Sequence, residues 1–244
     1  LGIPVAKMSG RGLGFTGGTV DKLEAIPGYT TNVPVDKFIE NVKRIGISLI
    51  GQTLNLAPAD KKLYALRDTI SCTDSIPLIA SSIMSKKIAS GANKIVIDVT
   101  CGNGAFMKNT YDAKELARVM TEIGRLAEKE TVCIITDMNE PVGHAVGNTL
   151  EVIEAIDVLK GKEMPKDIKN IITELAANML LLANKVKDID EGKAKILENI
   201  SNGKAYNKFL ELVENQGGDI TYIENIDKFE KAKYITPIIA KTSG

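Results

Sequence analysis

Hydrophobic residues recur along the chain in two rhythms, one typical of strands and one typical of helices. Short apolar, often β-branched runs predict strands at 3–7, 47–50, 94–99, 131–136 and 234–241. Apolar residues three and four positions apart predict helices at 20–25, 36–46, 58–68, 75–89, 111–130, 145–159, 168–187, 189–201 and 204–215. Strands that alternate with helices predict an α/β fold, with a mostly parallel sheet flanked by helices.

One segment departs from this alternation, because two helices follow each other between the strands at 47–50 and 94–99. The departure predicts either a crossover or an excursion into a separate helical lobe. We therefore expect a first part of an α/β domain at 1–57, a helical-lobe segment at 58–91 and a second part of the α/β domain at 92–244.

Composition narrows the class of protein without naming a function. The 31 Lys and Arg residues balance the 31 Asp and Glu residues, which argues against a protein that coats nucleic acid. One histidine rules out a metal cluster built on two histidines, and three cysteines without a CxxC pattern favour a reducing cytoplasm. No apolar run approaches the roughly 20 residues of a membrane span, and no signal peptide is visible.

The densest chemical signal is a glycine-rich stretch, Ser9–Thr19, which follows the first predicted strand. Its five glycines let backbone N–H groups converge on an anion, and hydroxyl groups at both ends add donors. A dinucleotide fingerprint is matched formally, but the next helix is too short for that unit, and Gly18 stands where a Walker A lysine would be. We interpret the stretch as a phosphate-binding loop, with a structural glycine turn as the alternative.

A second signal combines Arg67 with Ser82 and Lys86. Ser82 and Lys86 are four residues apart and share one face of the helix at 75–89, and Arg67 ends the preceding helix. A guanidinium, a hydroxyl and an ammonium group can hold a planar heterocycle and stabilise negative charge that develops on it. The alternative is ordinary solvated charge.

Two further turns follow predicted strands, where ligands bind in parallel sheets. Asp98 leads into a glycine turn at 102–104, which is equally well explained as a plain connection between strand and helix. The stretch 136–139 could offer oxygen ligands to a cation. His144 is best explained as a surface or capping residue.

Taken together, these motifs resemble the thymidine/pyrimidine-nucleoside phosphorylase family, most strongly its bacterial pyrimidine-nucleoside phosphorylases. The matching stretches keep their order and spacing over essentially the whole chain and lie at 8–24, 51–53, 57–68, 74–87, 102–108, 136–139 and 145–152. The resemblance implies the fold of nucleoside phosphorylases and anthranilate phosphoribosyltransferase, in which a small helical lobe and a larger α/β lobe close over the substrates.

The resemblance also implies reversible phosphorolysis of uridine, thymidine and deoxyuridine to the free base and a (deoxy)ribose 1-phosphate. Ser9 and Thr19 would bind phosphate, and Arg67, Ser82 and Lys86 would bind the pyrimidine. Arg67 and Lys86 would act in catalysis by stabilising the leaving base as an anion. Inorganic phosphate would be the co-substrate, and no nucleotide cofactor is expected.

Other family properties concern the assembly and a cation. The resemblance implies a cytoplasmic homodimer that contacts neither nucleic acid nor membrane, with the dimer contact in the helical lobe. Some members bind a potassium ion through backbone carbonyls and a glutamate, and the matching positions are Val142, Ala145 and Glu154.

The sequence departs from the family pattern in four places. A second phosphate loop, Lys-His-Ser-Thr-Gly-Gly, would precede Leu1, and a C-terminal lobe of roughly a hundred residues would follow Gly244. Phe15 replaces a frequent histidine, and Thr100 stands where a lysine is usual. We therefore expect an excerpt of a longer enzyme, with little activity of its own. The alternatives are a non-catalytic homologue that retains binding or dimerisation, and a phosphoribosyltransferase, whose acidic magnesium pairs we cannot assign.

Overall fold

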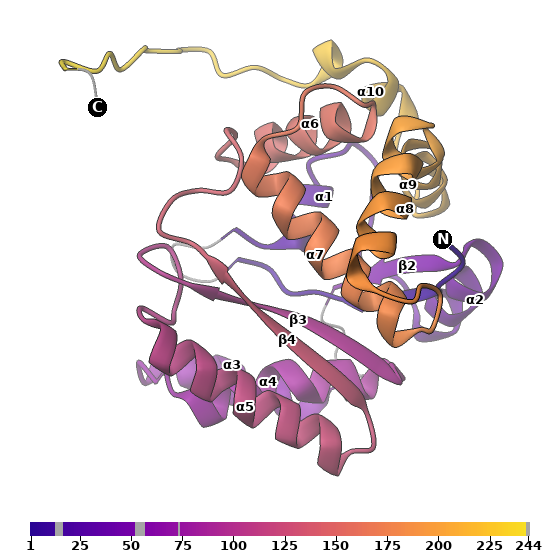
Figure 1. Ribbon diagram of the computed structural model, residues 1–244. Coiled ribbons are helices and arrows are strands. Elements are labelled where there is room, and N and C mark those ends of the chain that lie inside the picture. The colour runs from indigo at the N-terminus through magenta and orange to yellow at the C-terminus, as the bar shows by residue number, and fades with distance from the viewer. Residues whose placement is uncertain (13–16, 52–56, 73, 243–244) are drawn as a thin grey trace.

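The computed structural model describes residues 1–12, 17–51, 57–72 and 74–242 (Figure 1). Its strands are β1 (Val5–Met8), β2 (Ile47–Ile50), β3 (Lys94–Cys101) and β4 (Glu130–Asp137). Its longer helices are α2 (Val35–Ile45), α3 (Pro58–Thr69), α4 (Ile76–Ala89), α5 (Thr110–Leu126), α6 (Asn148–Leu159), α7 (Lys166–Leu182), α8 (Ile189–Ser201) and α9 (Lys204–Asn215). Three short helical segments are α1 (Thr19–Leu23), α10 (Ile220–Glu224) and the 3-10 helix η1 (Ile226–Lys228).

The strands of the described residues form two parallel pairs rather than one sheet. In the first pair, β1 lies beside β2 with Val5 opposite Ile47. In the second, β3 lies beside β4 with Lys94 opposite Glu130. The predicted α/β class is confirmed, and both pairs are parallel, as the alternation of strands and helices predicted.

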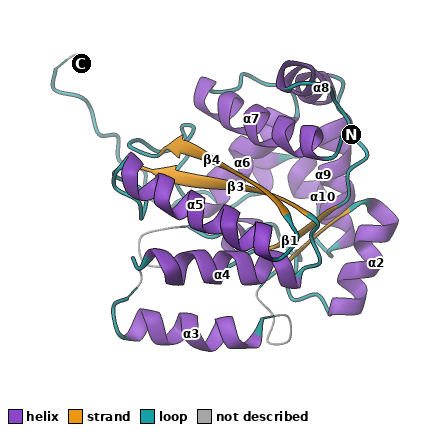
Figure 2. Ribbon diagram, turned by 60° about the horizontal axis from the view of Figure 1, so that its bottom comes forward, coloured by secondary structure: helices purple, strands orange, loops and turns teal. Residues whose placement is uncertain are grey.

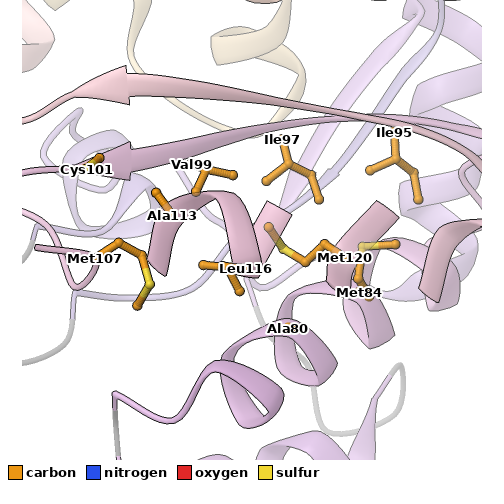
Figure 3. Packing of buried hydrophobic residues seen from close by; sticks show 10 residues of the cluster. All are labelled: Ala80, Met84, Ile95, Ile97, Val99, Cys101, Met107, Ala113, Leu116 and Met120. Atoms are coloured by element: carbon orange, nitrogen blue, oxygen red, sulfur yellow. The ribbon is translucent and has the colours of Figure 1, made fainter. Parts of the chain in front are cut away.

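The largest core lies between the β3–β4 pair and helices α4 and α5. Alternate residues of β3 point to this side, where they meet Met84 of α4 and Met120 of α5 (Figure 3). Figure 2 shows α5, α4 and α3 in succession on the same side of β3, and α7 packs on the opposite side. Helix α4 therefore belongs to the core of the sheet, and the division into 1–57, 58–91 and 92–244 stays a prediction.

Three smaller cores hold the remaining elements together. One joins α6, α9 and α10 with the turn after α1 through Ile26, Ile156 and Val213. Another lies between α7 and α8, and a third packs α2 against β1 and β2 through Phe38 and Ile50. The glycine-rich loop is therefore flanked by two packed elements, β1 before it and α1 after it.

One predicted strand is wrong. Residues 234–241 form no strand, and their apolar side chains are exposed, with Ile238 97% accessible. A β-branched run needs a neighbouring strand for its backbone hydrogen bonds, and none lies beside this one in the described part of the chain. None of the described helices has the length and apolar character that a membrane span requires.

Candidate active site

The glycine-rich loop connects β1 to α1. Ser9 directly follows β1, and its N–H donates to the carbonyl of Ile50 at 2.9 Å. Gly18 precedes α1, and a Cβ atom there would lie 2.3 Å from the nitrogen of Gly12. Only glycine allows this approach, so the loop folds back on itself with Ser9 and Thr19, both half-buried, at its two ends.

Two carboxylates hold the first half of this loop. Asp21 accepts a hydrogen bond from the N–H of Gly12 at 2.6 Å and another from Arg11 at 2.8 Å. Arg11 also pairs with Glu24 at 2.8 Å, and Glu24 accepts a hydrogen bond from the hydroxyl of Thr31 at 2.6 Å. The bond from Gly12 lowers the pKa of Asp21, and the bond from Thr31 lowers the pKa of Glu24, so both stay ionised and fix the loop.

The pyrimidine candidates meet where α3 packs beside α4 (Figure 2). The ammonium group of Lys86 lies 2.7 Å from the hydroxyl of Ser82 and 2.5 Å from a carboxylate oxygen of Asp60. The ring of Tyr64 lies 5.4 Å from this ammonium group. The Lys86 and Asp60 side chains are only 14% and 7% accessible, so the pair is shielded from solvent.

Arg67 joins the same group from the end of α3. Its residue is 7% accessible, its Nε donates to the carbonyl of Cys72 at 3.1 Å, and its Nη1 donates to the carbonyl of Leu78 at 3.2 Å. The centre of the Tyr64 ring lies 5.5 Å from the guanidinium carbon. A buried guanidinium with these contacts is not ordinary solvated charge, so the structure brings Arg67, Ser82 and Lys86 together around one aromatic ring.

Sequence reasoning missed Asp60 and Tyr64. Both lie on the face of α3 that carries Arg67, because Tyr64 is four residues after Asp60 and Arg67 is three residues after Tyr64. This helical spacing is the signal that could have found them. Asp60 was overlooked because its partner Lys86 is 26 residues away along the chain.

A hydrogen bond between neighbouring residues links the pyrimidine candidates to the glycine-rich loop. Lys87, the neighbour of Lys86 on α4, donates to the carbonyl of Met8 at 3.3 Å. Met8 immediately precedes Ser9, so α4 ties the pyrimidine candidates to the start of the glycine-rich loop. At the other end of that loop, Lys22 of α1 forms an ion pair with Glu151 of α6.

The loop before α6 contains the predicted potassium ligands. The carboxylate of Glu154 accepts hydrogen bonds from the N–H groups of His144 at 2.8 Å and Ala145 at 3.4 Å. Gly143 has a φ of +75°, and a Cβ atom there would lie 2.4 Å from the same carboxylate, so only glycine fits. Val142 is the residue before it, and Glu154 therefore lies against the loop that carries both predicted carbonyl ligands. His144 is exposed, as predicted.

The turn after β3 packs against the turn after β4. The N–H of Gly104 donates to the carbonyl of Met138 at 2.8 Å, and that of Asn103 to Asn139 at 3.2 Å. On β3, Asp98 accepts a hydrogen bond from the hydroxyl of Thr136 at 2.6 Å, and burial raises the pKa of this carboxyl group. No cluster of three or more metal-binding side chains occurs among the described residues, so 136–139 gains no support as a cation site of that kind.

Three sequence features lie outside the described residues. They are residues 13–16 of the glycine-rich loop, which include Phe15, and the second and third residues of the motif at 51–53.

Comparison with known proteins gives a consistent result. The family described as glycosyl transferase family, a/b domain, matches residues 1–206. Pyrimidine-nucleoside phosphorylase of Bacillus subtilis (strain 168) is 52% identical over 244 residues, which are 100% of this chain and 56% of that protein. The enzyme of the same name from Staphylococcus aureus (strain USA300) is 51% identical over 242 residues, 99% of this chain and 56% of that protein.

The chain thus spans little more than half the length of these relatives, and its similarity to them runs from end to end. The family resemblance drawn from the motifs is confirmed. This chain belongs to the glycosyl transferase family with the a/b domain, and its relatives there are pyrimidine-nucleoside phosphorylases.

Proposed function

We propose that this chain forms the substrate-binding core of a pyrimidine-nucleoside phosphorylase. The observation that carries the proposal is the meeting of Arg67, Ser82 and Lys86 around Tyr64, in a chain 52% identical to an enzyme of that name. Two cations and a hydroxyl group suit a flat ring that carries carbonyl oxygens and gains negative charge when it leaves.

In the proposed reaction, an oxygen of inorganic phosphate forms a bond to C1′ of uridine, thymidine or deoxyuridine. The bond between C1′ and the base nitrogen breaks, and its electron pair leaves with the base. Arg67 and Lys86 stabilise the resulting anion, which then takes a proton to become the free pyrimidine. Ser9 and Thr19, at the two ends of the glycine-rich loop, hold the phosphate that becomes part of the sugar 1-phosphate.

Asp60 acts in this scheme as a positioning residue. Its carboxylate and the Ser82 hydroxyl hold the ammonium group of Lys86 from two sides. The carboxylate orients the ammonium group before the base arrives, so that little reorganisation is needed when charge develops.

A potassium ion and a dimer belong to the same proposal. The carbonyls of Val142 and Ala145 and the carboxylate of Glu154 are hard oxygen donors that suit such a cation. Their fit is supported by the place of Glu154 beside this loop. The melting temperature should rise with KCl more than with NaCl, and equal effects of the two salts would contradict the site. We further propose a homodimer and a cytoplasmic location, which sedimentation and cell fractionation test.

A second candidate function is ligand binding without catalysis. The chain covers 56% of the length of its phosphorylase relatives, and binding and turnover are therefore tested separately. Phosphorolysis by the 244 residues alone would contradict this alternative, whereas nucleoside binding without turnover would support it.

The proposed site is tested by kinetics on the complete gene product. Replacing Lys86 by alanine removes an electrostatic contact to the leaving base, so kcat/KM for uridine should fall about 100-fold or more. Lys62→Ala, on the exposed side of α3, is the matched control and should leave kcat/KM near wild type. Unchanged turnover in Lys86→Ala would refute the site assignment.

A further inference from the structure

The side chain of Gln216 joins two segments that are far from it in the sequence. Gln216 directly follows α9 and is 3% accessible. Its Oε1 accepts a hydrogen bond from the N–H of Leu49 at 2.9 Å, and its Nε2 donates to the carbonyls of Leu49 at 2.7 Å and Thr30 at 2.9 Å. The hydroxyl of Ser48 donates to the same Oε1 at 3.3 Å. The two donors and two acceptor positions of the amide are therefore all used.

These bonds support the edge of β2 that faces away from β1. The carbonyl of Ile50 faces β1, because it accepts a hydrogen bond from the N–H of Ser9 at 2.9 Å. Successive strand residues direct their backbone groups to opposite edges, so those of Leu49 face the other way. Among the residues that the structure describes, no strand pairs with that edge. The Gln216 amide takes the place of a strand there, and it fixes the part of β2 that holds Ser9 at the start of the glycine-rich loop.

A second link to the glycine-rich loop runs through Thr31, which follows the residue whose carbonyl Gln216 binds. The hydroxyl of Thr31 donates to Glu24 at 2.6 Å, and Glu24 pairs with Arg11 of the loop at 2.8 Å. The carbonyl of Thr31 also accepts a hydrogen bond from the N–H of Gly51, just after β2, at 2.9 Å. One buried amide therefore stabilises both segments that hold the first half of the loop.

The turn after α9 keeps Gln216 in this position. The N–H of Thr30 donates to the backbone carbonyl of Gln216 at 3.0 Å, so the two residues are joined by main chain and side chain alike. A Cβ atom on Gly28 would lie 2.5 Å from the carbonyl oxygen of Gly217, which shows how closely the two turns approach. The amide is therefore held in place before it contacts β2.

We propose that Gln216 is a positioning residue of the phosphate site, which acts through β2 and Thr31 on the placement of Ser9 and Arg11. The inference rests on the proposed function, in which Ser9 binds phosphate. A buried group that loses its hydrogen-bond partner keeps its full cost of desolvation, so the segments around Gln216 would rearrange without it. Within the described residues, the hydrogen bonds of Gln216 reach neither α3 nor α4, so the pyrimidine candidates should be little affected.

The first test compares the kinetics of the complete gene product with those of Gln216→Met. Methionine has a similar length and no amide, so the buried backbone groups of Leu49 and Thr30 lose their partner. The KM for phosphate should rise about 10-fold, whereas the KM for uridine should stay within about twofold, because the displaced loop misplaces only the phosphate donors.

Ile196→Ala is the matched control for a loss of stability as such. Ile196 belongs to the core between α7 and α8, so its truncation should lower the melting temperature while the KM for phosphate stays near wild type. An unchanged KM for phosphate in Gln216→Met, or an equal rise in both variants, would overturn the proposal.

Amide hydrogen exchange distinguishes this inference from the proposed function, because it needs no turnover. The N–H of Ser9 is held by the carbonyl of Ile50, so peptides that contain Ser9 should exchange about 10-fold faster in Gln216→Met than in wild type or Ile196→Ala. Equal exchange in the three proteins would overturn the proposal even where phosphorolysis is observed. A wild-type protein without phosphorolysis would refute the proposed function, and faster exchange at Ser9 in Gln216→Met would still support the link between Gln216 and the loop.

Discussion

At the scale of single residues, the candidate site depends on a balance of buried charge. Asp60 pairs with Lys86 inside the site, and Arg67 donates hydrogen bonds to the backbone carbonyls of Cys72 and Leu78. Both buried cations of the candidate site are thus held in position by groups of the protein. Sequence spacing made Arg67 and Lys86 candidates and the family resemblance selected them, whereas Asp60 was missed because its pairing with Lys86 depends on how α3 packs against α4.

Replacing Asp60 by asparagine tests this balance. The change leaves the shielded ammonium group of Lys86 without its counter-charge, so the free energy of unfolding should fall by about 3 kcal/mol or more. Urea unfolding measures it, and kcat/KM should fall with it as Lys86 loses its orientation. Glu40→Gln removes the exposed ion pair with Lys37, 3.1 Å long, and should cost well under about 1 kcal/mol. Equal effects of the two variants would contradict the role given to Asp60.

At the scale of elements, the sequence predicted the helices well, because their signals are local, but it did not predict which strands pair. The helices at 189–201 and 204–215 were predicted with their observed ends, helped by a local signal such as the capping side chain of Asp188. The predicted strand at 234–241 failed because strand formation depends on a distant partner that composition does not reveal. For the same reason, the sequence predicted a parallel sheet but not its division into two pairs.

The closed form of the glycine-rich loop leads to a prediction at this scale. In Gly18→Ala, the new methyl group would overlap the backbone of Arg11 and Gly12, so the loop must open and displace the proposed phosphate donors. The kcat/KM for phosphate should fall by about 100-fold, as misplacement by an ångström can cause. Gly10→Ala is the matched control, because a methyl group there meets no atom within 4 Å. Equal kinetics of the two variants would favour a purely structural turn.

At the scale of the whole molecule, the elements that carry the candidate groups are supported by more than one hydrophobic core. Helices α4 and α6 and strand β1 each belong to a separate core. A groove with a volume of about 590 Å³ lies between β1 and the start of β3.

Phosphorolysis is tested most directly by following uracil release from uridine by the complete gene product, with and without inorganic phosphate. The account predicts rapid release that requires phosphate and yields one ribose 1-phosphate, seen by phosphorus NMR, for each uracil. Release at the same rate without phosphate, or the absence of release with it, would contradict the account.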